Sequence, residues 1–293
     1  MDISRKIRKY THKLNHTNNP DKISVYNKKL KYYRTYNQRG GGTITYPNGD
    51  VYKGEEKYGK PHGRGIMTYT TGNKYDGEWF MGWKDGQGIQ KHANLNGEYD
   101  GQWRLDTLHG YGIMKYFNGD VYKGNWRGEG TATGFSFRHG QGVLTYANGS
   151  TYDGEWFRGS KAKGIQIYAN GDKYDGEWRD KQDNGDEKHG EGIQTYANGT
   201  KYDGIWQQNE KHIWGVQTYL DGDKYEGEWE FGRKHGRGVR TTFAGEKYDE
   251  VWQYKTLVSS QKQPITALLR EKEETEEKGE ERLGLMRQLE FGI

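Results

Sequence analysis

The sequence predicts an all-β repeat array: an elongated, twisted, single-layer antiparallel sheet of β-hairpins, with short α-helical extensions at both ends. The first observation is a frame, Tyr-x-Gly-x-Trp, that recurs seven times in full and twice in part. The first tyrosines of successive frames, from Tyr52 to Tyr248, are 23, 24, 23, 30, 22, 28, 23 and 23 residues apart. A fixed period of this length indicates a repeat protein.

Two further observations support this fold class. Each frame is followed by a segment of the His-Gly-x-Gly type and then, in most repeats, by an Asn-Gly or Asp-Gly pair, which is typical of hairpin turns. Hydrophobic residues make up only 31%, whereas the chain has 45 Gly, 24 Tyr and 10 Trp. We therefore expect burial to come from aromatic rings packed over glycines.

Residues 1–39 are predicted to form a basic helical hairpin. Apolar residues fall at helical spacing in two runs, one on each side of Asn19 and Pro20. The segment carries 11 Lys and Arg against two Asp, a net charge of +9. One interpretation is that it covers the first edge of the sheet; the alternative is that it binds an anionic membrane or an acidic partner. The lipid-binding candidates are Arg5, Lys6, Arg8, Lys9, Lys13, Lys28, Lys29 and Lys31.

Residues 40–254 are predicted to form the array itself, about eight repeats with partial ends. Because side chains alternate along a strand, the Tyr, Gly and Trp of each frame share one face, and residues such as Asp76 and Glu78 share the other. The Asn-Gly pairs are expected to form type I′ turns between repeats. Two repeats carry insertions, before His139 and before His189, at the same loop.

The frame Tyr75-Asp-Gly-Glu-Trp79, with His-Gly-x-Gly and an Asn-Gly turn, resembles the MORN (membrane occupation and recognition nexus) repeat, over roughly residues 40–252. The resemblance implies a non-catalytic scaffold or adaptor whose aromatic groove binds helical or extended protein segments, and it implies self-association in some members. It also implies an alternative, a module that binds anionic lipids or phosphoinositides. The net charge of −4 on residues 40–254 opposes lipid binding by the array, so the basic arm is the expected carrier.

Residues 255–293 are predicted to form a charged helix or tail, with a fully polar middle. No hydrophobic stretch approaches the length of a membrane span, and the N-terminus has no apolar signal region. The chain is expected to be intracellular and cytoplasmic, with association to a cytoskeleton, a membrane or a large assembly as further expectations. Nucleic-acid binding is not expected, because no base-reading motif accompanies the basic arm.

No catalytic, cofactor-binding or metal-binding residue is predicted. Cysteine is absent. A row of histidines recurs at one repeat position, but equivalent positions in adjacent repeats lie about 10 Å apart, too far for shared ligation of one ion. Recurrent carboxylates likewise argue against a unique active site. The partner-binding candidates are Trp79, Trp83, Trp103, Trp126, Trp156, Trp178, Trp206, Trp214 and Trp229; of these, Trp83 and Trp214 fall outside the frame.

Overall fold

The computed structural model describes residues 6, 9–13, 25–29, 41–93, 97–129, 134–181 and 185–264. The chain divides into two compact units, residues 1–160 and 161–293. Asn96, the centres of both insertions and residues 265–293 lie outside the described residues, as do Arg5, Arg8 and Lys31.

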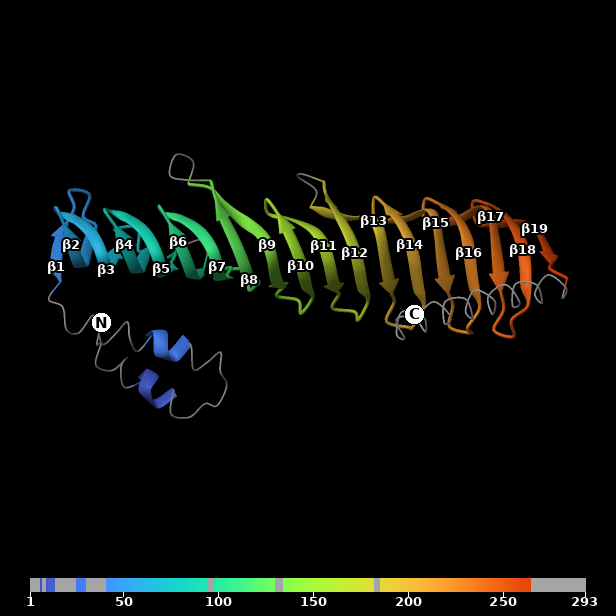
Figure 1. The fold of residues 1–293 in the computed structure, drawn as a ribbon, viewed down its shortest axis with the longest axis horizontal. Helices are drawn as coiled ribbons and strands as arrows, with labels where there is room; N and C mark the ends of the chain where they lie inside the picture. Colours follow the sequence, from blue (N-terminus) through green and yellow to red (C-terminus); the bar gives the residue numbers. More distant parts are fainter. Residues whose placement is uncertain are drawn as a thin grey trace, which may run out of the picture. The chain divides into compact units, whose positions relative to one another are not determined.

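In unit 1 each strand pairs antiparallel with the next strand along the chain (Figure 1). The strands are β1 (Gly42–Thr45), β2 (Val51–Lys57), β3 (Lys60–Thr68), β4 (Lys74–Phe80), β5 (Trp83–Lys91), β6 (Glu98–Arg104), β7 (Thr107–Lys115), β8 (Val121–Gly128), β9 (Ser136–Thr145) and β10 (Thr151–Phe157).

Unit 2 repeats this arrangement, again with consecutive strands paired antiparallel. Its strands are β11 (Ser160–Ile167), β12 (Lys173–Asp180), β13 (Asp186–Thr195), β14 (Lys201–Gln207), β15 (Glu210–Thr218), β16 (Lys224–Glu230), β17 (Arg233–Thr241), β18 (Lys247–Gln253) and β19 (Thr256–Lys262). The predicted all-β, antiparallel hairpin fold is confirmed.

The Asn-Gly pairs connect one repeat to the next, as predicted, but the expectation of type I′ turns is wrong. The Gly49 N–H donates to the Tyr46 carbonyl at 2.9 Å, and Gly49 has φ +88, whereas Asn48 does not have a positive φ. Instead, the Asn48 Oδ1 accepts the N–H of Asp50 at 3.1 Å, a local bond that holds Asn48 in the right-handed region. Among the described residues, each such turn therefore needs the left-handed conformation only at its glycine.

Turns with two successive positive φ angles lie at the other end of the hairpins that carry no insertion. Between β4 and β5, Met81 has φ 51 and Gly82 has φ 98; between β6 and β7, Leu105 and Asp106 have φ 46 and 64. These connections join the frame strand to the His-Gly strand within one repeat. Turns of this hand match the twist of the paired strands, which explains why residues other than glycine adopt the positive φ.

The N-terminal arm contains helical residues at 9–13 and 25–29, the two short blue segments of Figure 1. The rings of Tyr10 and Tyr26 lie 6.1 Å apart. The Lys29 Nζ lies 3.7 Å from Asp100 Oδ2 on β6. This contact between arm and sheet is therefore on a strand inside the array.

The end of the array differs from the boundary predicted at residue 254. Residues 256–262, which were assigned to the C-terminal helix or tail, form β19 and pair with β18. Every residue of β19 is exposed, and none belongs to a frame. Among the described residues, no helix is long and apolar enough to cross a membrane.

Candidate functional site

The two faces of the sheet carry different side chains. We call the face that bears the Tyr, Gly and Trp of each frame the aromatic face, and the opposite face, which bears Asp76, Glu78 and their equivalents, the outer face. In β4 the residues of the aromatic face, Tyr75, Gly77 and Trp79, are all buried. The alternation predicted from the frame is present in each frame strand of both units.

The frame tyrosines are held by the backbone. Tyr75 is fully buried, and its Oη donates to the Glu78 carbonyl at 2.9 Å. Its ring lies over Gly88 of the neighbouring strand, where an added Cβ would come within 2.3 Å of the Tyr75 Oη. The second glycine of the His-Gly-x-Gly segment is therefore required by the ring and not by a turn.

The frame tryptophans join adjacent repeats. Trp103 packs edge-on against Tyr99 of its own frame and Tyr75 of the preceding frame, with ring centres 5.2 and 5.3 Å away. Its indole N–H donates to the Gly88 carbonyl at 3.2 Å. The same ring packing buries six predicted partner-binding residues: Trp79, Trp103, Trp126, Trp156, Trp206 and Trp229. In all of them but Trp126 the indole N–H donates to a glycine carbonyl. Trp178 is half-buried.

A lysine is enclosed between consecutive frames, a feature that the sequence analysis did not identify. The Lys84 Nζ lies 5.6, 5.2 and 4.8 Å from the ring centres of Tyr69, Tyr75 and Trp103. It also donates to the Oε1 of buried Gln90 at 2.6 Å. Burial lowers the pKa of Lys84 to about 8, and the same cause lowers the pKa of Lys188 and Lys211 to about 8.

The enclosed lysine occurs with a glutamine except in the last repeat, where Lys234 occurs with Arg240. Four repeats contain both: Lys84 with Gln90, Lys161 with Gln166, Lys188 with Gln194, and Lys211 with Gln217. Two repeats that have Pro61 or Leu108 at the lysine position have Met67 or Met114 at the glutamine position. The amide thus accompanies the ammonium group that donates to it. The lysine and glutamine positions therefore vary together between repeats, and this covariation is the feature of the sequence that could have indicated the contact.

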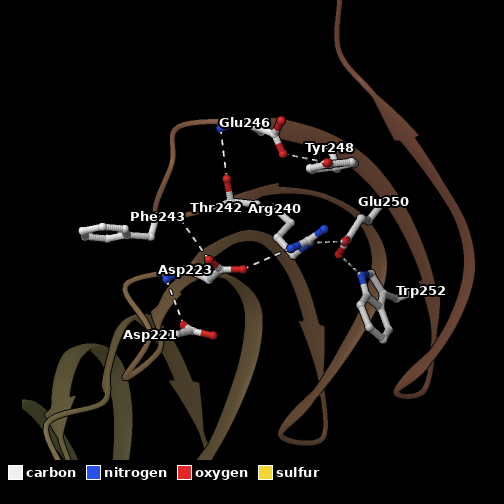
Figure 2. Close-up of polar contacts among 9 residues, drawn as sticks. All are labelled: Asp221, Asp223, Arg240, Thr242, Phe243, Glu246, Tyr248, Glu250 and Trp252. Atoms are coloured by element: carbon white, nitrogen blue, oxygen red, sulfur yellow. Dashed lines mark hydrogen bonds and ion pairs between the residues drawn. The ribbon is translucent and has the colours of Figure 1, made fainter.

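The last repeat keeps an enclosed lysine, Lys234, but has Arg240 in place of the glutamine, and Arg240 belongs to an ionic network shown in Figure 2. Glu250 stands where other frames have glycine, and its Oε2 accepts the indole N–H of Trp252 at 2.9 Å. Arg240 bridges Glu250 Oε1 and Asp223 Oδ2, at 3.0 Å each. Tyr248 donates to Glu246 instead of to the backbone carbonyl three residues on. Terminal repeats that differ in this way are typical of caps.

The histidines that recur at one repeat position pack beside the turn of their own repeat's neighbour that follows in the chain. The His62 ring lies 5.6 Å from that of Phe80, and the Met81 N–H donates to the His62 Nδ1 at 3.4 Å. His235 packs in the same way against Tyr254, with ring centres 4.5 Å apart. Within the described ranges, no group of three or more His, Asp or Glu side chains is placed to hold a metal ion.

The outer face carries some of the accessible apolar side chains. Trp83 and Trp214, the two candidates outside the frame, are 43% and 46% exposed. Phe80 and Phe157 are exposed next to the frame tryptophans of their strands, and Phe231 is exposed in the turn that follows β16. The structure thus separates the nine candidate tryptophans into those that form the aromatic face and two that remain available to a partner.

Of the lipid-binding candidates, five lie among the described residues: Lys6, Lys9, Lys13, Lys28 and Lys29. Each lies in a helical segment. Lys29 forms an ion pair with Asp100 and lies 5.5 Å from the Tyr10 ring centre. At least one basic group of the arm is therefore directed toward the sheet.

No curated protein matches the chain. The TCP10 domain of Danio rerio CPAP, solved in complex with a peptide of Danio rerio STIL, is similar at 12% identity over 76% of this chain and 95% of that chain, with a TM-score of 0.43. The TCP domain of Drosophila melanogaster SAS-4 (dCPAP), in complex with a proline-rich motif of Ana2 (dSTIL), is similar at 14% identity over 72% and 83%, with a TM-score of 0.25. We draw no argument from likenesses of this size.

The family comparison is specific. The MORN repeat model matches seven segments, residues 52–74, 75–96, 99–121, 136–151, 152–173, 184–201 and 225–245. The matched segments contain most of the hairpins in which the Tyr, Gly and Trp of the frame make the same contacts. The chain therefore belongs to the MORN repeat family.

Proposed function

We propose that this protein is a non-catalytic scaffold that binds protein partners through the side chains that its repeats leave exposed. The observation that carries the proposal is that the polar side chains that could do chemistry recur from repeat to repeat and are engaged within the hairpins. The frame tyrosines bond to backbone carbonyls, the lysines are enclosed by aromatic rings, and the histidines pack against turns. These groups stabilise hairpins, which supports a role in presenting a surface.

The available contact surface is apolar and aromatic. Exposed aromatic side chains recur along the repeats, among them Phe80, Trp83, Tyr111, Phe157, Trp214 and Phe231. Aromatic residues contribute much of the binding energy at protein interfaces because they contact a large area at a small entropic cost. Since the frame tryptophans are buried, we assign partner binding to these exposed residues and to Trp83 and Trp214 among the predicted candidates.

Panning a random peptide library against the purified full chain tests the proposal. We expect enrichment of a family of peptides whose binding is weakened at least tenfold by alanine at exposed aromatic positions of the outer face. Trp83→Ala and Trp214→Ala are the first two variants to compare with the wild type. A screen that enriches no peptide above the bare support would contradict the proposal.

A further inference from the structure

The hairpin of β14 and β15 differs from the other hairpins at three positions of the outer face. Ile205 stands where the other full frames have Glu, Gln or Asn, although the last, partial frame has Val251. Ile213 stands where six other repeats have the first glycine of the His-Gly-x-Gly segment. Trp214 follows, at a position that elsewhere holds Arg, Gln, Glu, Lys or Tyr. Three polar or small residues are thus replaced by large apolar ones at one place.

The backbone at Ile213 is strained. Its φ is +57, and its side chain is 63% exposed. A β-branched residue is unfavourable in this left-handed region, which the equivalent glycines adopt freely. At Gly236, for example, φ is +63 and an added Cβ would lie 2.3 Å from Glu228 Oε2. In this hairpin the corresponding glutamate is Ile205, so the two substitutions are compatible with each other.

This strain is not offset by burial, because most of the Ile213 side chain is in solvent. Trp214 is 46% exposed beside it. Strained backbone that the fold itself does not require is found at binding sites and switch regions. The substitutions therefore indicate a contact surface.

The surroundings of this surface are acidic. Ile205 pairs with Glu191 on β13, and Trp214 pairs with Glu228 on β16. Val216, two residues after Trp214 on the same face, pairs with Asp203 and Glu226. We call Ile205, Ile213, Trp214 and Val216 the Trp214 patch. Four carboxylates occupy neighbouring register positions, although Lys201 already lies 3.2 Å from Asp203.

In unit 1 the outer face contacts a basic segment of the chain itself. Asp100 occupies the same frame position as Asp203, and its Oδ2 lies 3.7 Å from the Nζ of Lys29 in the helical arm. A second arm lysine, Lys6, acts on Asp76: burial raises the pKa of Asp76 to about 6, and Lys6 opposes that rise. In unit 1, therefore, a basic helical segment of the chain itself is placed against the aspartates of this face.

We propose that the Trp214 patch is a docking site for a basic amphipathic helix of a partner protein. The apolar side of the helix covers Ile213 and Trp214, and its lysines and arginines pair with Glu191, Glu226 and Glu228. The inference rests on the proposed function, since it assigns a surface and a partner chemistry to the scaffold.

Fluorescence anisotropy tests the site with the full chain and a defined probe, a fluorescein-labelled peptide of residues 1–39. The test variant is Ile205→Glu with Ile213→Gly and Trp214→Gln, which restores residue types found at these positions in other repeats. The control is Phe117→Gln, an exposed aromatic in the turn between β7 and β8, which has no part in the proposed binding surface. We expect saturable, salt-sensitive binding that is at least tenfold weaker in the triple variant and unchanged in the control.

The melting temperature of the triple variant is expected to equal or exceed that of the wild type, so that lost binding does not report unfolding. Equal affinity of the triple variant and the wild type would overturn the site. Failure of the peptide to bind, or equal binding of a peptide with its basic residues changed to Glu, would overturn the partner chemistry. A wild-type dimer that the triple variant dissolves, seen by sedimentation velocity, would assign the patch to a second copy instead. Each of these results leaves enrichment of other library peptides, and with it the proposed function, intact.

Discussion

At the scale of the residue, an enclosed lysine helps to cover the aromatic face of the single-layer sheet. The ammonium group lies among three rings that attract it, and a buried amide oxygen accepts one of its protons, as at Lys84 and Gln90. Removing one member of a buried polar pair lowers stability, because the other member is left without a hydrogen bond. Replacing both members by apolar residues changes stability little. This asymmetry explains why methionine replaces the glutamine in the repeats that have Pro61 or Leu108.

The coupling between lysine and glutamine is measurable at Lys211 and Gln217. Lys211→Leu leaves the Gln217 Oε1 without its donor. The double variant with Gln217→Met removes the unpaired amide as well. We therefore expect its free energy of unfolding to be about 1–3 kcal/mol higher than the sum of the two single effects predicts. Denaturant unfolding of the two single variants and the double variant gives this coupling. Gln90→Met, in a different lysine enclosure, is the control and should add independently to Lys211→Leu. Additive effects at both pairs would contradict the argument.

Backbone strain at the first glycine position predicts opposite signs for two substitutions. Ile213→Gly removes a β-branched residue from φ +57 and is expected to raise stability by about 1 kcal/mol. Gly236→Ile introduces the same residue at φ +63, where its Cβ would meet Glu228, and is expected to lower stability by more than 2 kcal/mol. Thermal unfolding of both variants decides the sign. A loss of stability in Ile213→Gly would show that Ile213 contributes packing.

At the scale of the element, the frame tryptophan fastens one hairpin to the next. Trp156 is 2% exposed, with its ring 5.5 Å from Tyr122 and 5.0 Å from Tyr152, and its N–H bonds to the Gly142 carbonyl. Trp156→Ala is expected to lower stability by roughly 3–5 kcal/mol through the cavity that it leaves. Trp83→Ala is the control, since Trp83 is exposed, and should change stability by less than about 1 kcal/mol. An unchanged melting temperature in Trp156→Ala, with partner binding lost, would move Trp156 from the core to the binding surface.

The last hairpin depends on its ionic cap. Glu250→Gly restores the frame glycine but removes a carboxylate that binds both Arg240 and Trp252. We therefore expect faster amide hydrogen exchange in β18 and β19, with little change in β12. The double variant Arg240→Gln with Glu250→Gly recreates the residues of internal repeats and should recover much of the protection. If Glu250→Gly alone left the exchange of β18 unchanged, the network would have no capping role.

The elements also show what sequence reasoning could and could not predict. The Tyr-x-Gly-x-Trp frame determines which residues share a face, because alternation follows from strand geometry alone. Asn48 and Gly49 marked a turn correctly but suggested the wrong type, since a side-chain bond to Asp50 keeps Asn48 right-handed. The turn at Met81 carries no such signal, because the twist of the paired strands imposes its positive φ. The enclosure of Lys84 joins residues of two repeats, so no single repeat reveals it.

At the scale of the whole molecule, each hairpin depends chiefly on its neighbours, as in other repeat proteins. The substitutions above are therefore expected to act locally, which allows Trp214 and Trp156 to be tested without loss of the distant repeats. The basic arm is the part that differs most from the array in charge: residues 1–39 carry +9, whereas residues 40–254 carry −4. Under the lipid-binding alternative, its lysines would have two competing acceptors, the aspartates of the outer face and an anionic membrane.

This competition yields a prediction for the lipid-binding alternative, measured by co-sedimentation with neutral and anionic vesicles. Any binding to anionic vesicles should weaken as salt is added and should be absent from residues 40–264, because the array alone is acidic. Asp100→Asn removes the acceptor of Lys29 and is expected to increase vesicle binding, since it frees that lysine. Asp203→Asn, at the same frame position in unit 2, is the matched control and should leave binding unchanged. Binding by residues 40–264 equal to that of the full chain would assign lipid recognition to the array instead of the arm.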